Sequence, residues 1–175
     1  VQTKMPQDDP HFLVNPYDDP VVVKINGKAS FLNSSPVKNL FERLVEQGKT
    51  RFVVDFQNCS GMDSTFLGIL AGLGIKLMKL DPPGTVVLCR LGERNRELVR
   101  NLGLHRLLII DDGSEQPHVP ESGKRETVSG NQALSEVENA RMVLQAHENL
   151  VEIDASNKTK FQDVIAFLKN QVEED

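Results

Sequence analysis

The residues best placed to do chemistry are Asp63, Ser64 and Thr65, which stand between a polar stretch and a long apolar run. Small polar residues before an apolar run are typical of a helix start, where their side chains accept hydrogen bonds from backbone N–H groups. A serine in the first helical turn lies beside unpaired N–H groups and the positive end of the helix dipole. A phosphate, with a charge of about −2, fits such a site without unfolding the domain. Ser64 is therefore a candidate modification site, and a plain helix cap is the alternative interpretation.

No catalytic constellation accompanies this serine in the sequence. Cys59 lacks an arginine at the spacing of a cysteine phosphatase loop. The glycines Gly68, Gly72 and Gly74 lack the lysine and hydroxyl of a phosphate-binding P-loop. No nucleophile, base and orienting group can be proposed together. We therefore predict that the protein is not an enzyme and needs no cofactor.

Histidines and cysteines are few and dispersed. The four histidines belong to different predicted elements: His11, His105, His118 and His147. His147 lies in a charged helical stretch, where a solvated side chain is expected. The two cysteines, Cys59 and Cys89, have neither the spacing of metal ligands nor that of a disulfide framework. We expect no metal site and a reduced, cytoplasmic protein.

The bulk composition excludes several classes of protein. The chain has 175 residues, of which 39% are apolar, enough for one domain with a core plus an appendage. The net charge is −5 and no basic run stands out, so nucleic acid is not expected as a direct partner. The longest apolar stretch, residues 66–80, is broken by glycines and a lysine and is too short to span a membrane. Neither nucleic acid nor a membrane is an expected partner.

The periodicity of apolar residues predicts alternating strands and helices. Residues 21–25 and 29–32 flank Asn26-Gly27, a dipeptide that favours tight turns, and predict a β-hairpin. Further strands are expected at 51–56, 85–91 and 107–110, with a polar loop at 57–62. Helices are expected after a cap at Ser34 or Ser35, from Ser64 to about Leu80, and from Glu93 to Asn101. This order predicts an α/β fold with helices packed on a sheet.

Composition divides the chain into four segments. Residues 1–20 are expected to be an extension, residues 21–112 the folded domain, and residues 113–130 a linker. Within residues 131–175, apolar residues recur at helical spacing on both sides of a polar turn at 154–157, which predicts an αα-hairpin. This hairpin is expected to pack on the core. Pairing with a second copy as a homodimer and recruitment of a partner are the alternatives.

The segment Val53–Gly68, VVDFQNCSGMDSTFLG, resembles the STAS domain, the family of sulfate-transporter tails and anti-sigma factor antagonists. The resemblance covers residues 21–110 and includes the order of elements as well as this motif. It implies a STAS-like mixed sheet of about four to five strands, with the helical hairpin added at the C-terminus. Phe66 departs from the family pattern, because a small residue is common at that position.

The resemblance also implies a function. In the family, the serine after the aspartate accepts phosphate from an anti-sigma factor kinase, which corresponds to Ser64 here, with Thr65 as the alternative acceptor. The implied protein is a bacterial anti-sigma factor antagonist that binds an anti-sigma factor serine kinase when unphosphorylated. Phosphorylation at Ser64 releases it and a serine phosphatase resets it. The alternative is a non-catalytic STAS scaffold subunit of a signalling or lipid-transport assembly.

The predicted helix after Asp63 is apolar over more than half of its circumference, which is more than one sheet face can cover. We expect Phe66 to be at least partly exposed for a partner. For Ile69 and Leu73, cover by a neighbouring helix or by the C-terminal hairpin is the favoured interpretation. The expected partner-binding residues are Asp63, Ser64, Thr65, Phe66 and Ile69.

Overall fold

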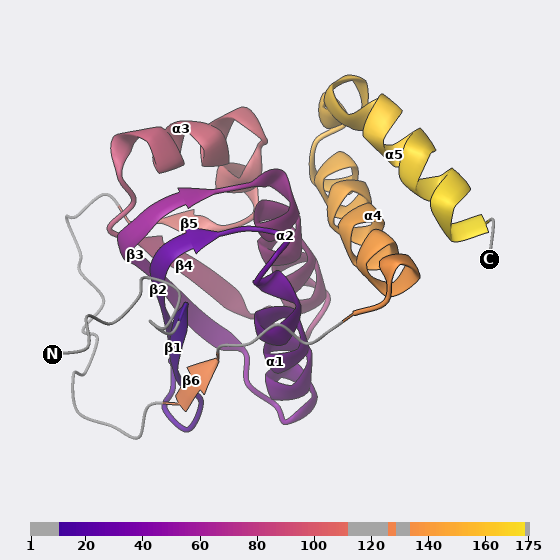
Figure 1. Cartoon of the computed structure of the whole chain (residues 1–175). Coiled ribbons are helices and arrows are strands. Elements are labelled where there is room, and N and C mark those ends of the chain that lie inside the picture. The colour runs from indigo at the N-terminus through magenta and orange to yellow at the C-terminus, as the bar shows by residue number, and fades with distance from the viewer. Residues whose placement is uncertain (1–10, 112–125, 129–133, 174–175) are drawn as a thin grey trace, which may run out of the picture.

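The computed structural model describes residues 11–111, 126–128 and 134–173 (Figure 1). Its strands are β1 (Phe12–Asn15), β2 (Val21–Ala29), β3 (Arg51–Met62), β4 (Thr85–Cys89), β5 (Ile109–Ile110) and β6 (Glu126–Val128). Its helices are α1 (Ser34–Glu46), α2 (Ser64–Met78), α3 (Glu93–Asn101), α4 (Glu136–Ile153) and α5 (Asn157–Glu173), with a short 3-10 turn, η2, at Leu104–Arg106. From β2 to β5 strands and helices alternate, as the periodicity predicted.

The strands form one mixed sheet of six strands in the order β5-β4-β3-β2-β1-β6. Strands β2, β3, β4 and β5 run parallel to one another, whereas β1 is antiparallel to both β2 and β6. The predicted α/β class with a mixed sheet is confirmed. Two strands come from segments that the sequence interpretation left outside the domain: β1 from residues 1–20 and β6 from residues 113–130. Residues 1–10, 112–125 and 129–133 lie outside the described residues.

The predicted β-hairpin around Asn26-Gly27 is wrong. Strand β2 continues through both residues and pairs with β3, and its register shifts between Lys24 and Asn26 and again between Gly27 and Lys28. The backbone of Gly27 has φ 85°, a left-handed value that glycine adopts without steric cost. Because a bulge can require the same conformation as a hairpin turn, the dipeptide alone does not separate the two. The antiparallel partner of β2 is instead β1.

Strand β3 is longer than predicted, because residues 57–62 continue it instead of forming a loop. Its first half pairs with β2 and β4, and the last pair with β4 joins Asp55 to Cys89. Beyond Asp55 only β2 accompanies it, up to the pair between Met62 and Ala29. This second half is partly exposed, which explains its polar composition.

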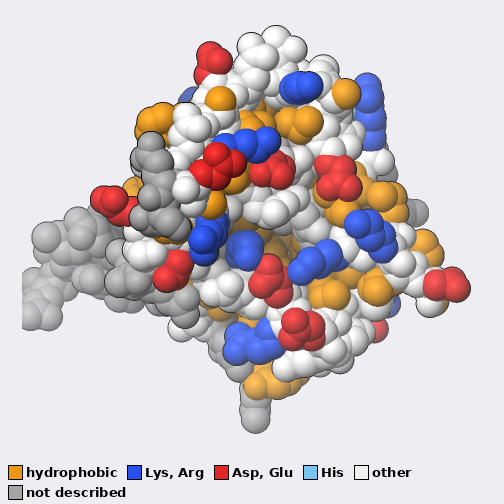
Figure 2. Space-filling model, turned by 90° about the vertical axis from the view of Figure 1, so that its right-hand side faces the viewer, with side chains coloured by type: hydrophobic (Ala, Val, Ile, Leu, Met, Phe, Trp, Pro, Cys, Tyr) orange, Lys and Arg blue, Asp and Glu red, His pale blue; other side chains and the backbone are white. Residues whose placement is uncertain are grey.

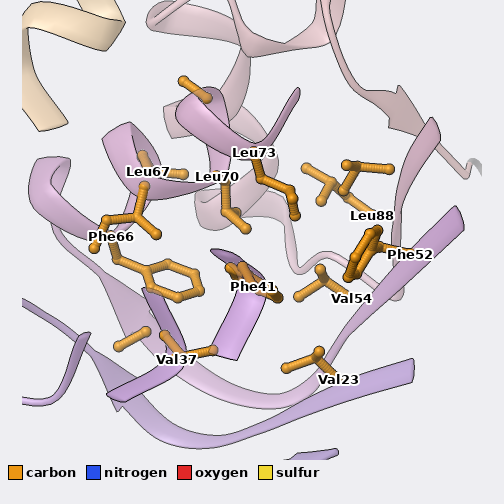
Figure 3. Close-up of a cluster of buried hydrophobic side chains, with 14 of the residues drawn as sticks. Val23, Val37, Phe41, Phe52, Val54, Phe66, Leu67, Leu70, Leu73 and Leu88 are labelled. Carbon is orange, nitrogen blue, oxygen red and sulfur yellow. The ribbon is translucent and has the colours of Figure 1, made fainter. Parts of the chain in front are cut away.

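The main core lies between the sheet and the helices. Along β2 and β3, alternate side chains point to this side, as the two-residue period of a strand requires. They pack with apolar residues from α1, α2, α3 and α4. Figure 3 shows Phe66 and Leu70 of α2 directed toward Val37 and Phe41 of α1. A small second cluster, Val22, Val53 and Cys89, lies on the opposite face.

The predicted C-terminal helical pair is confirmed as α4 and α5. Helix α4 lies alongside α2, and α5 packs on α4 on the side away from the sheet (Figure 1). The turn between them is held by Asn157, a fully buried residue whose Nδ2 donates to the carbonyls of Leu102 at 2.9 Å and Leu150 at 2.8 Å. The helical pair is therefore joined to the end of α3 as well as to α2.

Candidate functional site around Ser64

The start of α2 is fixed by Asp63. One carboxylate oxygen, Oδ1, accepts from the backbone N–H of Phe66 at 3.0 Å, which is the hydrogen bond of an N-cap. The other oxygen, Oδ2, accepts from the backbone N–H of Phe31 at 2.8 Å. Asp63 thus ties the first turn of α2 to the loop that follows β2.

The hydroxyl of Ser64 is hydrogen-bonded to a histidine from the C-terminal helical pair. Ser64 is the first residue of α2 and is half-buried, and its Oγ lies 2.9 Å from Nε2 of His147. The other ring nitrogen, Nδ1, lies 2.7 Å from the carbonyl oxygen of Val143. Because a carbonyl only accepts, Nδ1 carries a hydrogen, and in the neutral ring Nε2 accepts from the Ser64 hydroxyl.

The expectation of a solvated His147 is wrong, since only 4% of the residue is exposed. Its ring packs edge-on against Phe161 of α5, with the ring centroids 5.0 Å apart. The charged residues that suggested solvent lie elsewhere on α4: Arg141 and Glu148 are exposed. His147 belongs to the face that meets α2, because its Nε2 contacts Ser64 and it lies three residues before Leu150, a core residue.

Helices α2 and α4 approach each other so closely that glycine is required at the contact. A Cβ at Gly68 would lie 2.1 Å from the carbonyl oxygen of Ala146. One at Gly72 would lie 2.6 Å from Nδ2 of Asn149, a movable side chain. That same Nδ2 donates to the carbonyl oxygen of Gly68 at 3.1 Å. Gly68 and Gly72 therefore form a docking face for α4.

Several residues expected to meet a partner are buried in the chain itself. Phe66 has no exposed surface and stacks on Phe12 of β1 with ring centroids 5.9 Å apart, so the expectation of a partly exposed ring is wrong. Its ring faces the sheet because β1, which the sequence did not reveal, supplies an aromatic partner. Thr65 is 4% exposed and Ile69 6% exposed. Leu73 is also buried, so for Ile69 and Leu73 cover within the chain, the favoured interpretation, is what the structure shows.

Two residues near the site escaped the sequence analysis. Phe31 and Leu32 are 43% and 70% exposed, and the backbone N–H of Phe31 bonds to Asp63. The sequence analysis assigned both to the second strand of the predicted hairpin, residues 29–32. Exposed apolar side chains beside the start of α2 are candidates for contact with another protein.

A groove runs between α1, α2 and α4, with a volume of about 490 Å³. Its apolar floor includes Ile69, Leu73 and Met142. Lys38 at its rim is paired with Glu42 at 2.8 Å. The face that carries α4 and α5 mixes cationic and anionic side chains and has no patch of a single sign (Figure 2).

The cysteines are poor nucleophiles in this fold. Burial raises the pKa of the Cys59 thiol. Burial, followed by the negative charge of Asp55, raises the pKa of Cys89 to about 11. Asp55 is itself buried and paired with Arg90, whose Nε donates to its Oδ1 at 3.0 Å and whose Nη2 contacts its Oδ2. Both thiols are therefore protonated at neutral pH.

Within residues 11–111, 126–128 and 134–173, no three His, Cys, Asp or Glu side chains come together in an arrangement that could hold a metal ion. None of the helices described has the length and apolar content needed to cross a membrane.

The molecule is thus an α/β domain with a mixed sheet, in which a capped helix begins with a half-buried serine. Residues 11–116 match the family model of the STAS domain, and the chain belongs to that family. The match begins at β1, so it includes the strand that the sequence analysis did not predict.

Two solved structures are similar in fold. One is the anti-sigma factor antagonist SpoIIAA in its unphosphorylated form, with 19% identity and a TM-score of 0.45, covering 54% of this chain and 80% of that one. The other is the Bacillus cell fate determinant SpoIIAA in its phosphorylated form, with 19% identity and a TM-score of 0.48, covering 58% of this chain and 92% of that one. No curated protein matches this chain.

Proposed function

We propose that this STAS protein is an anti-sigma factor antagonist, a cytoplasmic binding module rather than an enzyme, whose switch is Ser64. Unphosphorylated, it binds an anti-sigma factor serine kinase and so frees a sigma factor. The kinase transfers the γ-phosphoryl group of ATP to the Ser64 hydroxyl, and a serine phosphatase later removes it. Membership of the STAS family and the motif Asp63-Ser64-Thr65 support this assignment.

The observation that carries the proposal is the place of Ser64 at the first position of a capped helix. The side chain of Asp63 caps the first turn, so α2 is held at its start without help from Ser64. A phosphate on Ser64 would lie near the positive end of the helix dipole, where its charge is tolerated. The fold can therefore survive the modification, and the added charge acts on binding.

Thr65 is the less suitable acceptor of the two hydroxyl residues. It is 4% exposed, whereas Ser64 is half-buried. The two side chains are separated by about 100° around the helix, so a partner that reaches one is poorly placed for the other. This favours Ser64 among the two candidates that the sequence left open.

The exposed side chains of Phe31 and Leu32 lie on the loop that Asp63 holds. We assign them to the kinase-binding surface in place of the buried Phe66. A dianion placed at the edge of an apolar contact costs several kcal/mol if no cation matches it, and about 1.4 kcal/mol corresponds to a tenfold change in affinity. Phosphorylation at Ser64 would then release the partner.

The test uses the full chain and the anti-sigma factor kinases encoded in the same genome. With kinase and ATP, the wild-type protein should gain the mass of one phosphate, and fragmentation should locate it on Ser64. Ser64→Ala should remain unmodified, and Thr65→Ala, the matched control, should be modified like the wild type. Modification of Ser64→Ala at the wild-type rate would show that Ser64 is not the acceptor.

The second candidate function, a scaffold subunit of a signalling or lipid-transport assembly, is favoured by α5. Its outer face exposes two apolar side chains, Val164 at 44% and Phe167 at 64%. The scaffold function is supported instead by two results together: no kinase binds or modifies the chain, and Phe167→Asp dissociates a complex that is isolated with the wild-type protein.

A further inference from the structure

We propose that α4 and α5 cover Ser64, and that the hydrogen bond between His147 and Ser64 holds this cover in place. Packing of α4 on α2 and docking of a kinase at Ser64 would then exclude each other, and the protein would regulate its own modification. The identity of the excluded partner rests on the proposed function. The cover itself is tested without that partner.

The first step concerns the hydroxyl. For phosphoryl transfer, the Ser64 oxygen must lie close to the phosphorus atom of the transferred group and in line with the bond that breaks. In the structure this oxygen is held 2.9 Å from Nε2 of His147, a ring that is 4% exposed and wedged between α2 and Phe161. The ring of His147 therefore occupies one side of the hydroxyl.

The second step concerns the surface around the hydroxyl. From Ser64 to Gly72, the flank of α2 is in contact with α4 through backbone and side chains. The contact at Gly68 is so close that a methyl group there would overlap the carbonyl of Ala146. A kinase that binds this flank of α2 would overlap with α4.

The third step concerns what holds the cover on the domain. The groove of about 490 Å³ between α1, α2 and α4 shows that α4 does not fill the whole flank. Among the described residues, His147 and Asn149 make the polar contacts of α4 with α2, and Asn157 and Lys160 of α5 donate to the carbonyls of Leu102 and Asn101 at the end of α3.

The experiment compares three full-length variants with the wild type. Gly68→Ala drives a methyl group into the backbone of Ala146 and leaves Ser64 and His147 unchanged. His147→Ala removes the hydrogen bond to Ser64. Gly92→Ala is the matched control, because its added Cβ meets nothing within 4 Å.

The first readout is hydrogen exchange, which needs no kinase. Amides of residues 143–149 should exchange roughly tenfold faster in Gly68→Ala than in the wild type and the control, while residues 51–56 of β3 keep their protection. Unchanged exchange at 143–149 in both Gly68→Ala and His147→Ala would overturn the cover. Loss of protection in β3 of Gly68→Ala would mark general unfolding of that variant. The exchange at residues 143–149 in His147→Ala would then test the cover in its place.

The second readout is the rate at which kinase and ATP phosphorylate Ser64. Only the molecules in which α4 has left Ser64 can be phosphorylated, so a larger fraction of such molecules raises the rate. Both Gly68→Ala and His147→Ala should therefore be modified at least about fivefold faster than the wild type. Slower modification of His147→Ala would overturn the proposal, because it would make the ring a helper of the reaction rather than a block. If no variant is modified, the proposed function fails, while the exchange experiment still decides whether α4 covers Ser64.

Discussion

At the scale of single residues, Phe66 holds β1 against α2, because its ring has no exposed surface and stacks on Phe12. Truncation to alanine leaves a cavity between a strand and a helix. We expect Phe66→Ala to lower the free energy of unfolding by about 3 to 5 kcal/mol, measured by urea denaturation. Phe31→Ala, which truncates a ring that is 43% exposed, serves as the control and should lose less than about 1 kcal/mol. Similar losses in the two variants would contradict the burial of Phe66.

The thiol of Cys89 offers a prediction on pH. Its pKa is raised from 9.0 to about 11, so the folded state favours the protonated thiol. The associated contribution to stability is complete below pH 9 and is lost as the pH rises toward 11. At pH 8, alkylation of Cys89 by iodoacetamide should be at least about a hundredfold slower in the folded chain than in urea, because fewer thiolates are present and the residue is only 3% exposed. Peptide mass analysis measures the alkylation. Equal rates in the folded chain and in urea would contradict the raised pKa.

Residue-scale prediction from the sequence works where the cause is local. The cap at Asp63 and the position of Ser64 follow from neighbours in the chain, and both were predicted. His147 lies 83 positions from Ser64, and its burial depends on how α4 meets α2, which no local pattern of charges reveals. The burial of Phe66 likewise depends on Phe12, in a segment that the sequence left unassigned.

At the scale of elements, helices were easier to predict than strands. Helix α3 has the predicted bounds, Glu93–Asn101, and α4 and α5 follow the predicted apolar spacing. The errors lie in the sheet: β1 and β6 each have four residues or fewer, too short for a sustained alternation. The glycine at position 27 was assigned to a hairpin because a turn and a bulge share its backbone conformation.

Asn157 links three helices, which gives a prediction for the element scale. Its Nδ2 satisfies the carbonyls of Leu102, at the end of α3, and Leu150 in α4. Asn157→Ala should leave both carbonyls buried without this donor and lower the free energy of unfolding by about 2 to 3 kcal/mol. Lys158→Ala, at the next and exposed position, is the control and should change it by less than about 0.5 kcal/mol. Thermal denaturation followed by circular dichroism measures both.

At the scale of the whole molecule, the relation between the domain and its C-terminal helices can be tested by truncation. A chain that ends at Val128 keeps β6 but loses α4, whose Met142, Ala146 and Leu150 belong to the main core. We expect this chain to fold cooperatively, with a free energy of unfolding lower by roughly 3 to 5 kcal/mol. A chain without a cooperative thermal transition would show that α4 and α5 are an inseparable part of the domain.

The short outer strands have a consequence for how copies of the molecule can meet. In the described sheet, one border is β6, with three residues, and the other is β5, with two. A long uncovered border would act as a template for strand addition, whereas so few free backbone groups give an incoming strand little to bind. Growth of the sheet from one copy into the next is therefore disfavoured. Association of two copies would instead involve helices, for which the outer side of α5, with Val164 and Phe167 exposed, offers apolar surface.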